Sequence, residues 1–311
     1  MAVQQGSFSD GMFVTSSDRM LGAIFGIAVG DALGAPHEFR PPLPEDFELT
    51  MSGGNGWEPG EWTDDTSMAI AILLAWRDNG EFGSEASLDS LVQYWVEWSH
   101  TAKDIGNQTR EVLGALQTNT AAEATAAAEA FHHKNFQSAG NGSLMRTAPL
   151  ALLDVNDQTL TDITARVSLL THYEADATEA CIIWVHTIRE AIRTGTLNLE
   201  PGLNQLNLDT QTKWRARIAQ AEAKLPVDFD NNGWVVSAFC AALSAVVMGL
   251  DSFEEGINYA VKCGWDTDTV GAIAGSLLGA IHGFDAIPKD WIEPLHGWPG
   301  FKLSELIWFL T

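Results

Sequence analysis

Two short clusters of acidic and hydroxyl side chains, far apart in the chain, have the residue types of a metal site. The letters TDDT occupy residues 63–66 and DTDT occupies residues 266–269, and each cluster opens an apolar segment with helical spacing. Either cluster alone is also typical of a helix N-terminus, where acids and hydroxyls bind free backbone amides. Together they offer four carboxylates and no cysteine or histidine, which suits Mg²⁺ or Mn²⁺ rather than Zn²⁺. Two such ions would offset the repulsion between the carboxylates and activate water or polarise a substrate oxygen.

Three further sites carry residues suited to substrate chemistry. Glu38 begins a long loop, where it suits a general base or a substrate clamp, although a solvated loop acid has the same pattern. The small-residue turn at 138–146, SAGNGSLMR, presents backbone amides to an anion as phosphate sites do, and similar turns are common in ordinary loops. His172 lies between two predicted helices, where a single histidine is usually structural.

Glycine recurs at every fourth position in two apolar stretches, at residues 22–34 and 271–283. Each glycine inside a helix costs about 0.5–1 kcal/mol relative to alanine. Glycines four apart leave a smooth ridge on a helix, so that another backbone can come close. We therefore expect tight helix packing at these ridges, with the helices bringing the acids at their ends into one site.

The elements that must position these residues are helices, and no convincing series of alternating strands is present. The pattern predicts a mostly α fold with a loosely docked or flexible arm at 1–17 and a single domain at 18–311. A long loop at 39–62 and a polar, irregular stretch at 195–232 with one helix interrupt it. The predicted helices span residues 18–33, 65–78, 86–100, 107–131, 145–154, 159–171, 175–194, 211–223, 234–249, 252–262 and 268–282.

Composition narrows the classes of protein to which the chain can belong. Of its 311 residues, 46% are hydrophobic and 19% charged, so a substantial core is expected. The net charge of −24 argues against binding to nucleic acid or to anionic membranes. Three cysteines without a CxxC pair indicate free buried thiols in a reducing compartment, and the first residues lack the pattern of a secretory signal. The expected location is the cytoplasm, with the apolar run at 234–250 read as a buried helix rather than a membrane span.

Six stretches, in order, resemble the ADP-ribosylglycohydrolase family, which includes the dinitrogenase reductase-activating glycohydrolases and the ADP-ribosylarginine and ADP-ribosylserine hydrolases. The stretches are GIAVGDALGAPHEF, EWTDDTSM, KDIGNQTREVL, GNGSLMRTAPL, LTHYEADA and WDTDTVGAIAGSLLGA. Singly they are weak to moderate signals, but the ordered set covers nearly the whole chain and is specific. The resemblance implies an all-α fold, a single compact orthogonal helix bundle, with two Mg²⁺ or Mn²⁺ ions.

The resemblance also implies roles for individual residues, with Glu38 or a metal-bound carboxylate moving the proton. The metal ligands would be Thr63, Asp64, Asp65, Asp266, Asp268 and Thr269, and the catalytic residues Glu38, Asp65 and Asp266. The residues around the substrate would be Asp104, Ser138, Gly140, Asn141, Gly142, Ser143, Met145 and His172. Trp265 departs from the family pattern, where a small or polar residue is usual, and this bulk would line the adenosine or ribose pocket or narrow its entrance.

The activity implied is hydrolysis of the bond between ADP-ribose and a modified protein side chain, through an oxocarbenium-like transition state. Arginine is the preferred linkage, because the DIGN letters at 104–107 resemble the bacterial arginine-directed branch. A serine linkage, ADP-ribosylated nucleic acid and O-acetyl-ADP-ribose stay open as substrates. A non-catalytic binding role, or neutralisation of a toxin partner by reversing its modification or by physically blocking the toxin, is the alternative function.

Overall fold

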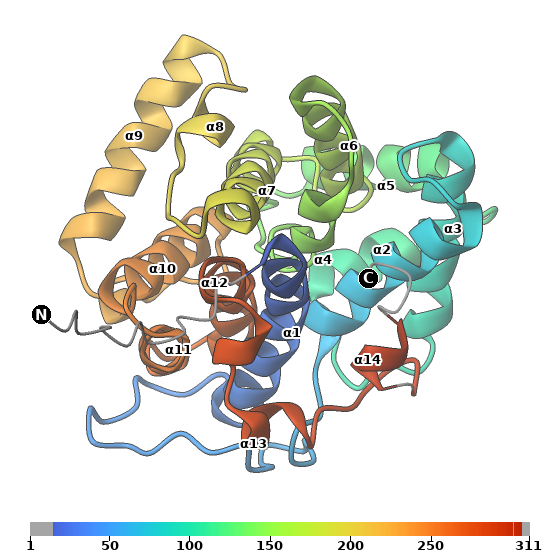
Figure 1. Ribbon diagram of the computed structural model, residues 1–311. Helices are drawn as coiled ribbons and strands as arrows, with labels where there is room; N and C mark the ends of the chain where they lie inside the picture. The colour runs from blue at the N-terminus through green and yellow to red at the C-terminus, as the bar shows by residue number, and fades with distance from the viewer. Residues whose placement is uncertain (1–14, 301, 307–311) are drawn as a thin grey trace, which may run out of the picture.

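Two glycine-bearing helices, α1 (Ser16–Gly34) and α12 (Thr267–His282), run side by side through the centre of the structure (Figure 1). The computed structural model describes residues 15–300 and 302–306, and within these ranges the fold is all-α, without a β-strand. Ten further helices surround the central pair or extend from it, and two short ones follow near the C-terminus. They are α2 (Asp64–Asn79), α3 (Glu85–Ser99), α4 (Asn107–Gly114), α5 (Ala121–Lys134), α6 (Asp157–Leu169), α7 (Ala175–Thr194), α8 (Glu200–Leu203), α9 (Leu208–Ala223), α10 (Val235–Met248), α11 (Phe253–Val261), α13 (Lys289–Ile292) and α14 (Leu303–Leu306).

The two glycine ridges face each other, as the sequence predicts. A Cβ atom built on Gly26 would lie 2.0 Å from the carbonyl oxygen of Gly275, and one on Gly30 would lie 2.0 Å from that of Gly271. A Cβ atom on Gly34 would lie 2.4 Å from the Cα atom of Asp268. The helices are therefore antiparallel with backbones in contact, and the C-terminal end of α1 meets the acid-bearing start of α12.

The helix predicted at 107–131 is wrong, because the chain divides it into α4 and α5. Thr120 is the N-cap of α5, and its hydroxyl accepts a hydrogen bond from the backbone amide of Glu123. The Glu123 carboxylate reaches back and accepts hydrogen bonds from the amides of Gln117 and Thr118, each at 2.7 Å. These local bonds compete with a continuous helix and outweigh the high helix propensity of the alanines.

Other predicted boundaries also need correction. Residues 1–14 of the predicted N-terminal arm lie outside the described residues, and α1 already begins at Ser16 with Thr15 as its N-cap. The segment at 145–154 forms only a short 3₁₀ helix, Ala148–Leu152, which has a proline in its first turn. The short helices α8, α13 and α14 are not predicted from the sequence, since each spans a single turn.

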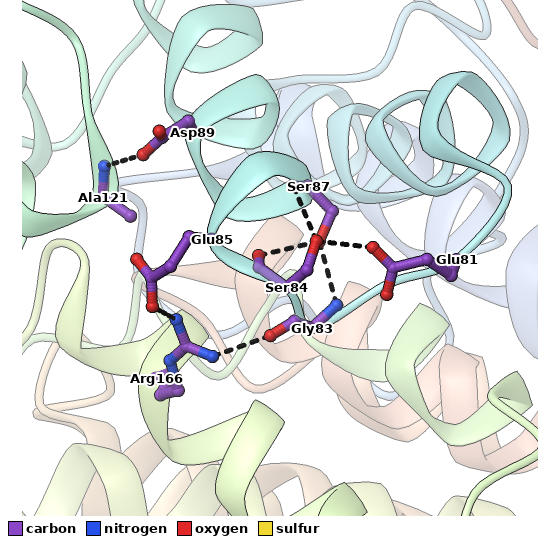
Figure 2. Close-up of polar contacts among 8 residues, drawn as sticks. All are labelled: Glu81, Gly83, Ser84, Glu85, Ser87, Asp89, Ala121 and Arg166. Carbon is purple, nitrogen blue, oxygen red and sulfur yellow. Dashed lines mark hydrogen bonds and ion pairs between the residues drawn. The ribbon is translucent and has the colours of Figure 1, made fainter.

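Polar contacts attach the start of α3 to two neighbouring helices (Figure 2). Arg166 of α6 donates a hydrogen bond to the carbonyl oxygen of Gly83 at 2.7 Å and pairs with Glu85. Asp89 of α3 accepts a hydrogen bond from the amide of Ala121, the first residue of α5, also at 2.7 Å. These contacts hold the start of α3 against α5 and α6.

Among the described residues, one helix is long and apolar enough to span a membrane by length and composition, at residues 16–37. In the structure, 83% of its apolar window is buried. It is the central helix of one contiguous hydrophobic core, where it packs on α12. The apolar helix α10 is also almost entirely buried, as predicted for the run at 234–250.

Candidate active site

Carboxylates from three helix ends meet where α1 finishes and where α2 and α12 begin. Oxygens of Asp31, Asp65 and Asp268 all lie within 4.8 Å of one another, and so do oxygens of Glu38, Asp266 and Asp268. Asp268 belongs to both groups and joins them into one cluster of acids. The two acid-rich sequence clusters are thus brought together by the packing of α12 on α1 and by the docking of α2.

Asp31, which was not among the predicted site residues, ties α2 to α1. Its carboxylate accepts hydrogen bonds from the backbone amide of Thr63 at 3.0 Å and from the amide of Thr66 at 3.0 Å. The hydroxyl of Thr66 donates a further bond at 2.6 Å. An acid from one helix therefore caps the N-terminus of another, where negative charge is favourable. A lone acid within the apolar run AIFGIAVGDALGA was the available signal.

A chain of amide contacts holds Asp266 in place. Asn141 donates a hydrogen bond to Asp266 Oδ2 at 2.7 Å and another to the carbonyl oxygen of Asn232 at 2.8 Å. The side chain of Asn232 accepts from the amide of Asp266 at 3.1 Å and donates to the carbonyl of Gly264 at 2.9 Å. Asn232 is 1% exposed and belongs to the polar stretch that the sequence left without a role. It therefore joins the 138–146 turn to the start of α12.

Burial and mutual repulsion raise the pKa values of these acids. Burial first, and then the charges of Asp266 and Asp104, raise the pKa of Glu38 to about 9. Burial and the charge of Asp104 raise the pKa of Asp64 to about 7. The pKa of Asp31 rises only to about 6, since hydrogen bonds from the start of α2 oppose the effect of burial. Without a bound cation the cluster therefore resists full ionisation and retains protons that isolated acids would lose at neutral pH.

The donor set fits a divalent cation. Asp65 Oδ1 and Asp268 Oδ1 are buried polar atoms without a hydrogen-bond partner in the described part of the chain. None of the ion pairs among the described residues involves an acid of the cluster. Unpaired buried carboxylate oxygens are costly unless something positive binds them. The hydroxyl of Thr269, 3.5 Å from Asp65 Oδ2, adds another oxygen of the type that Mg²⁺ and Mn²⁺ prefer.

The cluster lies at one side of a cavity of about 390 Å³. Its wall includes Glu38, Asp104 and His172, together with the 140–142 turn and the start of α12. A second cavity of about 540 Å³ adjoins it and shares three lining residues, Gln108, Gly140 and Gly233. Two exposed aromatic side chains, Phe136 and Trp234, stand on the wall of the second cavity.

Known proteins of one family match this chain over almost its whole length. A family model described as ADP-ribosylglycohydrolase matches residues 13–309. The chain belongs to the ADP-ribosylglycohydrolase family. A solved structure titled as an ADP-ribosylglycohydrolase-related protein complex aligns with a TM-score of 0.69 and 33% identity, covering 90% of this chain and 93% of that one. The fold and the family expected from the sequence are thereby confirmed.

Curated relatives of this ADP-ribosylglycohydrolase have named activities. The ADP-ribosylarginine hydrolase Tri1 of Pseudomonas putida is 30% identical, with 89% of this chain and 74% of that protein covered. Its counterpart in Serratia proteamaculans is 28% identical, with 90% and 76% covered. The ADP-ribosyl-[dinitrogen reductase] glycohydrolase of Rhodospirillum rubrum is 28% identical, with 89% and 90% covered. This chain is accordingly a glycosidic hydrolase.

The structure places most of the predicted site residues of the ADP-ribosylglycohydrolase around the first cavity. The residues that line it are Glu38, Asp64, Asp104, Gly140, Asn141, Gly142, Met145, His172, Asp266, Asp268 and Thr269. Asp65 lies beneath them, fully buried, and Thr63 faces a small neighbouring cavity that also reaches Asp64. Ser138 lines the second cavity rather than the first.

Two predicted substrate-binding residues lie away from both cavities. Ser143 is fully buried, and its hydroxyl accepts a weak contact from the thiol of Cys181 at 3.5 Å. Trp265 is 41% exposed and lines neither cavity. Its backbone instead pairs with the loop after α1, accepting from the amide of Phe39 at 2.6 Å and donating to the carbonyl of Arg40 at 2.7 Å. Both Trp265 and Phe39 have positive φ, 63° and 61°, so this pairing holds a strained loop next to Glu38.

Proposed function

We propose that this ADP-ribosylglycohydrolase hydrolyses the bond between ADP-ribose and an arginine side chain, with two Mg²⁺ or Mn²⁺ ions in the acid cluster. The observation that carries the proposal is the pair of unpartnered buried oxygens on Asp65 and Asp268, beside a cavity large enough for a ribose. Carboxylates of this kind suit metal-assisted hydrolysis rather than structural ion pairing.

The residues assigned to the ions are those that meet at the three helix ends. Asp64, Asp65 and Thr63 come from the start of α2, and they face the second cluster at the start of α12. That second set comprises Asp266, Asp268 and Thr269. When bound, the ions would hold the ribose hydroxyls and make a water molecule more acidic.

The chain's own residues supply orientation and proton transfer. The water oxygen bonds to ribose C1″ as the bond from C1″ to the arginine nitrogen breaks, with carboxylates stabilising the positive charge on the sugar. Glu38 or a carboxylate of the cluster, Asp65 or Asp266, accepts a proton from the water, and the leaving guanidine gains one. Glu38 stands on the cavity wall with 8% of its surface exposed, and cations bound at the cluster would lower its raised pKa so that it can accept this proton.

The second cavity suits the rest of the ADP-ribosyl group. The turn from Ser138 to Gly142 lies between the two cavities, where its backbone can meet the diphosphate. Phe136 and Trp234 offer aromatic faces on which a base can stack. The ribose at the acid cluster and the base at these aromatics would then be joined across Gly140.

The names of two relatives support arginine as the linkage, since the Pseudomonas putida and Serratia proteamaculans proteins are ADP-ribosylarginine hydrolases. The net charge of −24 disfavours ADP-ribosylated nucleic acid as a substrate. All three cysteines are free and buried, which agrees with a proposed location in the reducing cytoplasm.

The deciding experiment measures release of ADP-ribose from arginine-modified and serine-modified peptides in Mg²⁺, Mn²⁺ or EDTA. Release from the arginine peptide that EDTA abolishes is the expected result. The variant Asp266→Asn should lose turnover and keep its fold, whereas Asp290→Asn, an exposed acid on α13, serves as the matched control.

Full activity of Asp266→Asn, or full activity in EDTA, would refute the metal mechanism. Release from the serine peptide alone would move the linkage to serine, and release from neither would direct the search to O-acetyl-ADP-ribose. Tight binding of ADP-ribose without turnover of any of these would support the alternative, a binding member that blocks a modifying toxin.

A further inference from the structure

A buried arginine behind the first cavity has no acidic partner among the described residues. Arg146 is 0% exposed, and its guanidinium stacks 4.0 Å from the ring centroid of Trp95. It donates a hydrogen bond to the hydroxyl of Thr171 at 2.6 Å and a weaker one to the carbonyl of Val167 at 3.4 Å. Burying a cation that is held by a hydroxyl rather than a carboxylate costs free energy of folding. We therefore expect Arg146 to have a role beyond packing.

The hydroxyl of Thr171 has a second partner, the Nδ1 atom of His172, at 2.8 Å. An arginine can only donate, so the Thr171 oxygen must accept from Arg146. In the described part of the chain no other acceptor is bonded to this hydroxyl, so its hydrogen points to His172 Nδ1. A nitrogen that accepts a hydrogen bond carries no proton, and a neutral imidazole then carries its proton on Nε2.

His172 lines the first cavity, and the Nε2 side of its ring lies next to the glycine turn on the cavity wall. A Cβ atom built on Gly140 would lie 3.2 Å from His172 Nε2, and one on Gly142 would lie 3.1 Å from its Cε1 atom. Side chains at these two positions would crowd the ring, which is 2% exposed and forms part of the cavity wall. The side chain of Gln108 donates to the carbonyl of Thr171 at 2.9 Å and fixes the backbone at this point.

We propose that Arg146 and Thr171 are positioning residues that hold His172 as the neutral Nε2–H tautomer, so that it donates one hydrogen bond to an oxygen of the bound ADP-ribosyl group. The proposal rests on the proposed function for its ligand, but the tautomer itself is a property of the free protein. In this tautomer His172 is a fixed, neutral hydrogen-bond donor, and its acceptor would be an oxygen of the negatively charged diphosphate or of a ribose hydroxyl.

The surroundings of His172 agree with a neutral ring. Burial first, and then the positive charge of Arg146, lower the pKa of His172 well below its usual value. Arg146 thus has two effects, since its charge opposes protonation of the ring and its hydrogen bond orients the hydroxyl that selects the tautomer. Lysine at this position could not reproduce the stacking on Trp95 together with the two donated bonds.

Nitrogen NMR of the imidazole rings in the metal-loaded protein tests the tautomer directly, with His172→Gln used to assign the signals. The wild-type ring should give the pattern of the Nε2–H form. Thr171→Ser keeps the hydroxyl and should give the same pattern, whereas the isosteric Thr171→Val should show the Nδ1–H form or a mixture.

Calorimetric titration with ADP-ribose supplies the functional readout. Thr171→Val should bind about tenfold more weakly, the loss expected for one oriented hydrogen bond, and Thr171→Ser should recover most of the affinity. Turnover by Thr171→Val should show a raised KM with kcat little changed, because the metal ligands are untouched.

A wild-type spectrum of the Nδ1–H form or of imidazolium would overturn the proposal without the need for any variant. A folded Thr171→Val with an unchanged Nε2–H pattern would also overturn it. If the tautomer responds as expected but ADP-ribose binding does not, the donor role fails while the proposed hydrolysis stands. If the wild-type protein does not bind ADP-ribose at all, the proposed function is refuted instead.

Discussion

The contact between α1 and α12 makes Gly26→Ala a severe change for a single methyl group. The added Cβ atom would lie 2.0 Å from the carbonyl oxygen of Gly275, about 1.4 Å short of the 3.4 Å at which ordinary contact begins. Neither helix can relieve this by rotating a side chain, because the obstruction is backbone. Overpacking of a core costs about 1–3 kcal/mol, and the better helix propensity of alanine returns about 0.5–1 kcal/mol. Because the clash is with backbone, the cost lies at the upper end of that range, and we expect the free energy of unfolding to fall by roughly 2 kcal/mol.

The same displacement should weaken the proposed metal site, because α1 carries Asp31 and α12 carries Asp268. We expect affinity for Mn²⁺ to fall about 10- to 100-fold, which is the usual loss when residues that orient metal ligands are changed. Urea unfolding in EDTA and calorimetric titration with Mn²⁺ measure the two effects. Gly114→Ala is the matched control, since a Cβ atom there meets nothing within 4 Å. Stability and affinity of Gly26→Ala equal to those of Gly114→Ala would refute the reasoning.

Three further predictions concern the site and its loops. In the metal-free protein the free energy of unfolding should decrease as pH rises from about 4 towards about 9. Folded Glu38 and Asp64 have pKa values of about 9 and 7, so they keep protons that the unfolded chain has already lost. Urea unfolding in EDTA measures this slope, and saturating Mn²⁺ should abolish it. Asn232→Ala removes the side-chain oxygen that accepts a hydrogen bond from the backbone amide of Asp266. It should lower Mn²⁺ affinity, measured by calorimetry, about 10- to 100-fold, and an unchanged affinity would exclude a positioning role for Asn232. Phe39→Gly removes a 73% exposed side chain from a backbone with left-handed φ and should raise the free energy of unfolding in urea by about 1 kcal/mol. An unchanged free energy of unfolding would show that Phe39 is not strained.

Local patterns were enough to predict most of the longer helices and the approach of the two glycine ridges. The apolar period of three to four residues marks helix faces, and glycine spacing marks the side on which a neighbour can approach. The packing of the ridges brings Asp31 and Glu38 to the acids at the start of α12, whereas the 63–66 cluster joins them through the docking of α2 on Asp31. The residues placed around the cavity are therefore largely those whose neighbours in the sequence already suggested a function.

The residues that sequence reasoning missed act through partners far along the chain. The role of Asp31 depends on its hydrogen bonds with the amides of Thr63 and Thr66, and the role of Asn232 depends on its contact with Asp266. Neither pairing leaves a local pattern in the sequence. Arg146 is similar, because its hydroxyl partner, Thr171, belongs to another segment. The break before α5 was missed for a different reason, since the side chain of Glu123 satisfies the loop amides locally.

The contact of backbone with backbone between α1 and α12 also limits how this protein can evolve. A clash between two side chains can be relieved when the facing residue becomes smaller. At Gly26 the obstructing atom is the main-chain oxygen of a residue that is already glycine, so no complementary substitution exists opposite it. Selection for suppressors of Gly26→Ala should therefore recover reversion, or changes that shift a whole helix, and never a compensating change at Gly275.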